Sequence, residues 1–159
     1  MKMLIRKAVM KDITDIQKVA KETWNDTYEG IIPRVIQDRF IASAYSDENL
    51  ERRITKSLFL VATVNDSVIG FANFFSKQTE AVLGAIYIDP SEHGKGIGSE
   101  LLFTGIKELN GITRVLVEVE TGNEGGVAFY QAKGFYFVEE YDDHFDGHVL
   151  KTKRMALDL

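Results

Sequence analysis

The chain has 159 residues, of which 45% are hydrophobic and 27% charged, a composition typical of one globular domain. It contains no cysteine, which excludes disulfides, zinc ribbons, iron–sulfur clusters and a cysteine nucleophile. Only three histidines are present, so no metal site is expected. The net charge of −5 argues against a nucleic-acid partner bound by phosphate neutralisation, and it fits a small cationic substrate better.

No run of apolar residues is long enough to span a membrane. The opening residues include lysine and arginine, but the apolar run after them is too short for a signal peptide. We therefore expect a cytoplasmic protein without a membrane partner.

Hydrophobic periodicity predicts the secondary structure in chain order. A strand is followed by three helices, with Asp12, Pro33 and Ser46 or Asp47 suited to the helix starts. The period then changes to that of strands. The predicted strands are 3–8, 58–64, 68–76, 81–89, 114–120, 135–141 and 148–156, and the later helices are 98–109 and 127–133.

Two of these strands, 81–89 and 114–120, flank a helix and should be parallel neighbours. The remaining strands are expected to pair as hairpins, for example across residues 65–67. The sequence therefore predicts a mixed sheet in one α/β (α+β) domain over residues 1–159.

The segment with the clearest chemistry is a loop with glycines at 94, 96 and 98, placed between a strand and a helix. Alternating glycines let backbone N–H groups converge, and the helix N-terminus adds partial positive charge, so the loop is suited to a phosphate or pyrophosphate. The spacing excludes a Walker loop and does not complete a dinucleotide fingerprint. A glycine-rich turn without a ligand is the remaining alternative.

Two motifs resemble the GNAT superfamily of acetyl-CoA-dependent N-acetyltransferases. The first is His93-Gly94-Lys95-Gly96-Ile97-Gly98 after Ile86-Tyr87-Ile88-Asp89-Pro90, where the family has Gln or Arg at the place of His93. The second runs from Asn123 to Phe135 and has Gly126 where the family has Ala.

This resemblance implies the GNAT fold, a mostly antiparallel sheet of about seven strands with helices on both faces and a parallel pair splayed at the acetyl-CoA cleft. It also implies acetyl-CoA as cofactor, with the pantetheine arm beside the end of strand 81–89. The implied cofactor-binding residues are Ile86, Tyr87, Ile88, His93, Gly94, Lys95, Gly96, Ile97, Gly98, Ser99, Asn123 and Lys133.

Direct acetyl transfer to an amine in a ternary complex needs a base for the ammonium and an acid for the departing thiolate. By resemblance, Tyr130 is the candidate acid, although it could simply pack its helix. Glu118 is the candidate base and shares one strand face with Glu120. A solvated strand end, with deprotonation through water, is the alternative.

For the acceptor, the N-terminal helices loosely resemble PaiA-type spermidine/spermine acetyltransferases, which favours a polyamine. Trp24, Asp26 and Tyr28 could bind an alkylammonium by charge and cation–π contact, or the two aromatic residues could be ordinary core. A peptide N-terminus or lysine is the alternative acceptor, and a non-catalytic CoA-binding regulatory module is the alternative of another class. Homodimers are common in the superfamily, so the resemblance also suggests a homodimer.

Overall fold

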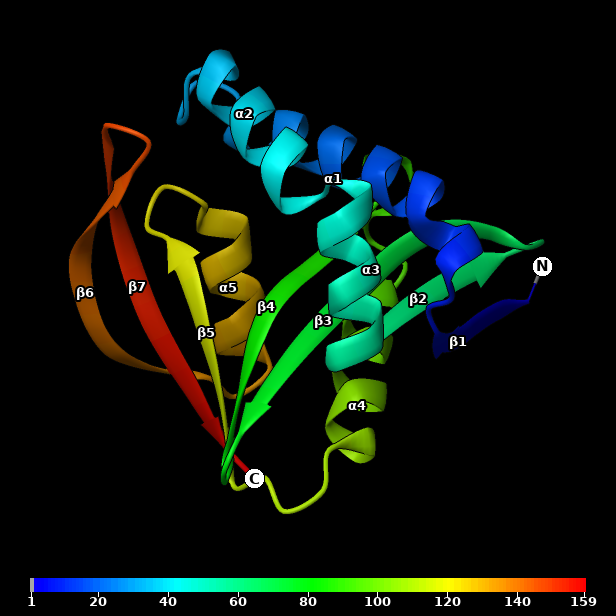
Figure 1. Ribbon diagram of the computed structural model, residues 1–159. Coiled ribbons are helices and arrows are strands. Elements are labelled where there is room, and N and C mark those ends of the chain that lie inside the picture. The colour runs from blue at the N-terminus through cyan, green and yellow to red at the C-terminus, as the bar shows by residue number, and fades with distance from the viewer. Residues whose placement is uncertain (1) are drawn as a thin grey trace. The chain divides into compact units, whose positions relative to one another are not determined.

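The computed structural model describes residues 2–159, which form a seven-stranded sheet with five α-helices (Figure 1). The strands are β1 (Met3–Lys7), β2 (Leu58–Val64), β3 (Ser67–Lys77), β4 (Glu80–Ile88), β5 (Arg114–Glu120), β6 (Tyr136–Phe145) and β7 (His148–Asp158). The helices are α1 (Ile13–Tyr28), α2 (Arg34–Ala44), α3 (Asp47–Lys56), α4 (Ile97–Glu108) and α5 (Glu124–Ala132), with short 3-10 helices η1 (Met10–Asp12) and η2 (Pro90–Glu92).

The strand order in the sheet is β1-β2-β3-β4-β5-β7-β6. β4 and β5 run parallel, whereas β1–β2, β2–β3, β5–β7 and β6–β7 are antiparallel. The predicted seven-stranded mixed sheet with one parallel pair is thereby confirmed.

The chain divides into two compact units. The first contains the residues up to Phe74 together with Ala85–Asn110, and the second contains Phe75–Gly84 together with Gly111–Leu159. β4 therefore begins in the second unit and ends in the first.

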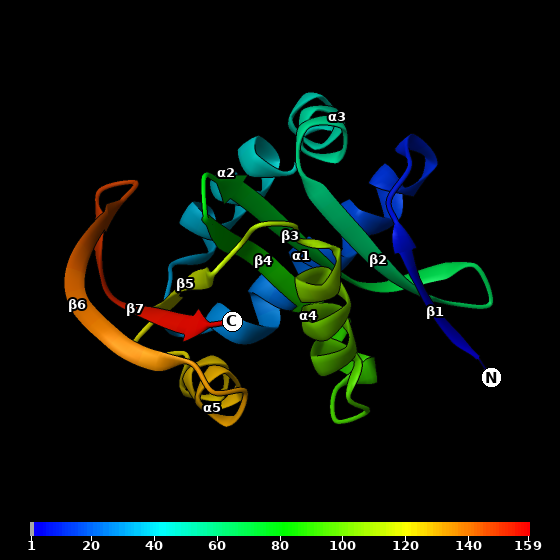
Figure 2. The same cartoon turned by 90° about the horizontal axis from the view of Figure 1, so that it is seen from below.

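In the first unit, helices cover both faces of β2 and β3 (Figure 2). Phe59, Val61 and Phe71 point to one face and pack in a core with residues of α1 and α3. Phe74 points to the opposite face, where it meets α4. The period of two along each strand explains this division, since successive side chains point to opposite sides.

The close approach of α4 to the sheet depends on Gly105. A Cβ at this position would lie 2.1 Å from Cε1 of Phe74, a ring that is itself fully buried. The absence of a side chain therefore sets the depth at which α4 packs, and α4 begins at the glycine loop.

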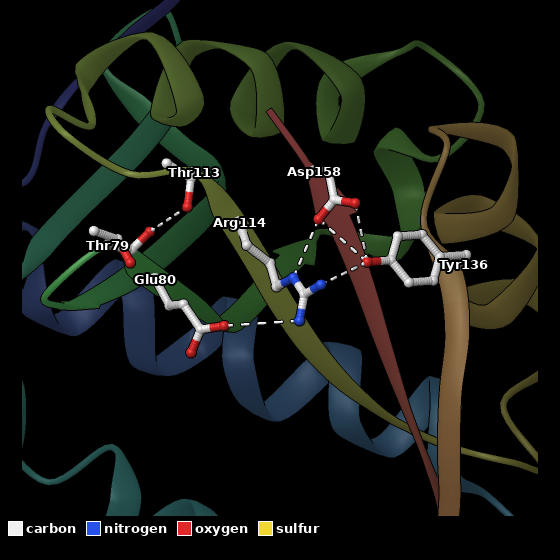
Figure 3. Close-up of polar contacts among 6 residues, drawn as sticks. All are labelled: Thr79, Glu80, Thr113, Arg114, Tyr136 and Asp158. Carbon is white, nitrogen blue, oxygen red and sulfur yellow. Dashed lines mark hydrogen bonds and ion pairs between the residues drawn. The ribbon is translucent and has the colours of Figure 1, made fainter.

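In the second unit, a polar cluster joins four strands near their ends (Figure 3). The Arg114 guanidinium lies 3.1 Å from Asp158 Oδ1, donates to the Tyr136 hydroxyl at 3.1 Å and lies 3.9 Å from Glu80 Oε2. These contacts connect the start of β5 to the starts of β4 and β6 and to the end of β7.

The prediction that the remaining strands pair as hairpins is wrong for β1–β2 and β5–β7. β1 and β2 are separated by three α-helices, and β7 inserts between β5 and β6. Burial explains the second case. β7 carries Leu150, Met155 and Ala156, which are all buried, whereas β6 is exposed along most of its length and takes the edge.

The predicted cap of α1 and the predicted start of α5 differ from the structure for local reasons. The carboxylate of Asp12 makes no bond to the α1 backbone, because it accepts from Arg6 at 2.8 and 2.9 Å and from the Val9 N–H at 2.8 Å. The hydrogen bonds from Arg6 hold the pKa of Asp12 below its usual value. α5 starts at Glu124 rather than at residue 127, because Asn123 caps it.

Replacing Gly105 with alanine is expected to lower the free energy of unfolding by about 1–3 kcal/mol, because the new methyl group must push Phe74 or α4 aside. Urea denaturation followed by circular dichroism measures the change. The control is Lys107→Ala at an exposed position of the same helix, with a change below about 0.5 kcal/mol. A Gly105→Ala protein more stable than wild type, as helix propensity alone favours, would contradict this packing.

Candidate functional site

The glycine loop adopts a backbone that only glycine adopts readily. Gly94 has φ +81° and Gly96 has φ +78°, both in the left-handed region. A Cβ at either position would meet nothing within 4 Å, so the requirement is for the backbone angle rather than for space.

The loop leads directly into α4, whose N-terminal residue Ile97 follows Gly96. At the start of the helix, the Glu100 N–H donates to the Gly96 carbonyl at 3.1 Å. The N–H groups of Ile97, Gly98 and Ser99 precede that bond and have no acceptor within the helix. Together with the helix dipole, they form a site whose chemistry fits a phosphate or pyrophosphate.

Two side chains of the loop contact the protein itself. The Lys95 ammonium lies 2.6 Å from Glu92 Oε2 and forms a solvent-exposed ion pair with it. The imidazole Nε2 of His93 lies 2.9 Å from the carbonyl oxygen of Ile88, to which it must donate. The sequence predicted that both residues contact the cofactor, and it did not predict their contacts with Glu92 and Ile88.

β4 ends beside this loop, and its pairing with β5 covers only Glu80–Val82. The Asp89 N–H donates to the Ile69 carbonyl of β3 at 2.8 Å. Because backbone groups alternate in direction along an extended strand, those of Ile86 and Ile88 face the other edge. That edge could pair with an amide-bearing ligand in the manner of an added strand.

Among the predicted acceptor residues, the structure brings Trp24 and Tyr28 together. Their ring centroids lie 4.6 Å apart, and the Trp24 ring also stacks on Phe40 at 4.2 Å and donates to the Tyr87 hydroxyl at 2.9 Å. Trp24 is buried, which favours its interpretation as a core residue. Asp26 is exposed and lies on another side of α1, since two helical positions span about 200°.

In the second unit, Asn123 forms the N-terminal cap of α5. Its Oδ1 accepts from the Gly126 N–H at 3.0 Å. Tyr130 follows two turns later, is 8% exposed, and packs edge-to-face on Phe129 and Phe135 at centroid distances of 5.3 and 5.4 Å. The Lys133 ammonium lies 5.6 Å above the Phe129 ring.

Glu118 has two partners that sequence reasoning missed. Its Oε2 accepts from the Tyr141 hydroxyl at 2.5 Å and its Oε1 from Arg154 at 3.2 Å. Burial, together with the bond to Glu118, raises the pKa of Tyr141 to about 12, so the phenol stays protonated at neutral pH. Glu118 lies opposite Arg154 in the pairing of β5 with β7. The sequence did not predict that these two strands are neighbours, so it did not predict this contact.

As predicted from the alternation along β5, Glu118 and Glu120 point away from the buried Val117 and Val119. One carboxylate oxygen of Glu120, Oε2, is buried without a hydrogen-bond partner among the described residues. The second unit thus presents two carboxylates on one strand face.

The predicted residues therefore fall into two groups. The glycine loop, the end of β4 and the α1 aromatic residues belong to the first unit, whereas Glu118, Asn123, Tyr130 and Lys133 belong to the second.

Comparison with known proteins agrees with the motifs. The model of the acetyltransferase (GNAT) family matches residues 15–135. The chain belongs to this family. It is a GNAT N-acetyltransferase.

Its relatives include the spermidine N(1)-acetyltransferase of Thermoplasma acidophilum, 33% identical over 87% of this chain and 90% of that protein. An uncharacterized N-acetyltransferase of Bacillus subtilis is 31% identical over 96% of this chain and 90% of its own length. The PaiA N-acetyltransferase of Thermoplasma acidophilum, solved in complex with coenzyme A, superimposes with a TM-score of 0.88 at 29% identity and full coverage of both chains.

The GNAT motif has Ala where this chain has Gly126. A Cβ at this position would lie 2.6 Å from the Asn123 amide nitrogen and 2.9 Å from its Cγ. Gly126 therefore leaves room for the Asn123 side chain to fold over the start of α5. An alanine at this position would crowd that side chain.

Within residues 2–159, no group of three or more His, Asp or Glu side chains is arranged to hold a metal ion. No helix in the same range is long and apolar enough to cross a membrane. His144 and His148 flank the β6–β7 turn.

The cap predicts different effects for two Asn123 substitutions. Asn123→Ala should lower the free energy of unfolding by about 1 kcal/mol, because the Gly126 N–H loses its acceptor. Asn123→Asp should retain wild-type stability, since a carboxylate oxygen accepts the same bond and suits the helix N-terminus. Urea denaturation compares the three proteins, and an equal loss in both variants would contradict the capping role.

Proposed function

We propose that residues 1–159 act as one acetyl-CoA-dependent N-acetyltransferase domain whose acceptor is a primary amine of a polyamine such as spermidine or spermine. The observation that carries the proposal is the start of α4, where left-handed glycines lead into amide groups that have no acceptor within the helix and are suited to a diphosphate. The 33% identity to a spermidine N(1)-acetyltransferase over most of both chains supports the choice of acceptor.

In this proposal acetyl-CoA supplies an acetyl group activated as a thioester. The backbone of residues 94–99 would hold its diphosphate, and the free edge of β4 at Ile86–Ile88 would pair with its pantetheine amides. Lys95, Asn123 and Lys133 complete the proposed side-chain contacts to the cofactor, whereas His93 lies in the same loop with its imidazole bonded to the Ile88 carbonyl. The donors at the start of α4 are fixed before binding, which limits the entropy lost when the cofactor docks.

For the proton transfers, we assign Tyr130 as the acid that protonates the departing thiolate. Its ring is buried and packs on Phe135, which fixes the direction of its hydroxyl, and a phenol O–H can donate a proton. Glu118 is the proposed base. Tyr141 and Arg154 each donate to one of its oxygens, so each oxygen keeps a lone pair for the amine proton, which arrives directly or through a water molecule.

For the acceptor, charge supports a cationic amine. The chain carries a net charge of −5, and β5 presents Glu118 and Glu120 on one face. On α1, the exposed Asp26 would attract the ammonium and Tyr28 would contact it, while Trp24 would shape the site by packing.

Tyr130→Phe tests catalysis. We expect kcat to fall by about 100-fold or more, since general acid–base groups contribute at least that factor, while CoA binding measured by calorimetry is retained. The matched control is Tyr136→Phe, which removes a hydroxyl from the Arg114 cluster and should leave turnover unchanged. An unchanged rate in Tyr130→Phe contradicts the assigned role, and wild-type CoA binding without turnover would favour a regulatory module.

A panel of acceptors tests the substrate. Spermidine and spermine should give a kcat/KM about tenfold or more above that of a lysine peptide or a small monoamine, because a second ammonium adds charge-assisted contacts. Thiol release from acetyl-CoA is the measurement, and the preference should weaken with added salt. If a peptide releases CoA and spermidine releases no more than buffer, the acceptor is a peptide or protein amine.

A further inference from the structure

One backbone carbonyl, that of Ile88, accepts hydrogen bonds from two side chains of different elements. The Thr23 hydroxyl of α1 donates to it at 3.2 Å, and the His93 imidazole of the glycine loop donates at 2.9 Å. A carbonyl oxygen has two lone pairs, so this acceptor is fully used. Among the backbone groups on the free edge of β4, the Ile88 carbonyl is therefore closed to a ligand.

This arrangement joins the acceptor-side helix, the last residue of β4 and the glycine loop at one atom. Thr23 is 5% exposed, so its hydroxyl is held in place by the packing of α1. His93, in contrast, is exposed and directly precedes Gly94. A buried donor and a loop donor thus share one acceptor at the point where the chain leaves the sheet.

The loop needs such an anchor because glycine loses more conformational freedom on ordering than any other residue. Residues 93–96 are all exposed and have little packing of their own. Within residues 2–159, the bond from His93 and the ion pair of Lys95 with Glu92 are the side-chain contacts of this stretch. Holding His93 against β4 sets the direction in which Gly94 and Gly96 approach α4.

We propose that His93 and Thr23 are positioning residues that anchor the glycine loop to the end of β4, with the imidazole turned toward the Ile88 carbonyl rather than toward the cofactor. Because the loop is ordered in advance, its amides bind a diphosphate with a smaller entropic loss. This inference rests on the proposed function, since its readout is the binding of coenzyme A.

The test measures the Kd of coenzyme A by calorimetry, and kcat and KM for acetyl-CoA, in the full chain. His93→Ala should raise the Kd by about threefold to tenfold, the value of one net hydrogen bond. His93→Gln should stay within about twofold of wild type, because its amide N–H can replace the imidazole donor. The loss should fall on Kd and KM more than on kcat.

Substitutions of Thr23 distinguish an anchoring role of His93 from a direct contact between His93 and the cofactor. Thr23→Val keeps the shape of the side chain and removes its donor, whereas Thr23→Ser keeps the donor. If both residues act through one carbonyl, the double variant Thr23→Val with His93→Ala should lose more affinity than the product of the single losses, since the carbonyl then has no donor. His144→Ala, an exposed histidine of β6, is the control and should leave the Kd unchanged.

The outcomes are distinct. A wild-type protein that does not bind coenzyme A overturns the proposed function and this inference with it. If wild type binds but His93→Ala binds equally well, the anchor alone is wrong. If His93→Gln loses as much as His93→Ala, or if the Thr23 and His93 losses simply multiply, then shared donation to the Ile88 carbonyl does not account for the affinity and the positioning role is overturned.

Discussion

The backbone at Gly94 and Gly96 is the constraint on which the proposed site depends. Left-handed angles at two nearly adjacent residues turn the chain from the end of β4 into the start of α4. The turn leaves the amides of the first helical residues without acceptors inside the helix. An anion can satisfy those donors and gains from the helix dipole as well.

The side chains around that turn have a structural task. Lys95 forms an exposed ion pair with Glu92, and His93 is bonded to the strand, so both side chains have partners within the protein. Gly105 adds to the same arrangement, because it lets α4 pack closely on Phe74. The position of the α4 N-terminus is therefore determined by packing some distance along the helix as well as by the loop itself.

The second unit differs from the first, because its polar side chains are held in place by other groups of the protein. Glu118 is held by Tyr141 and Arg154, and Asn123 is held by the first turn of α5, so the polar groups of this unit have defined orientations. Fixed orientation favours catalysis, since groups that are already in place need not reorganise. One oxygen of Glu120, Oε2, is buried and has no hydrogen-bond partner among residues 2–159, which costs free energy unless a donor reaches it.

Local sequence determined the strands at 58–64 and 114–120, the parallel pair and the glycine loop, because these depend on side-chain periodicity and on turn chemistry between near neighbours. Tertiary structure alone decided the place of β7 between β5 and β6, the contact of His93 and Thr23 with one carbonyl, and the pairing of Glu118 with Tyr141 and Arg154. These contacts join residues 5 to 65 positions apart. Which strand takes the centre of a sheet depends on the total apolar surface buried, a quantity that belongs to the whole fold and not to any one segment.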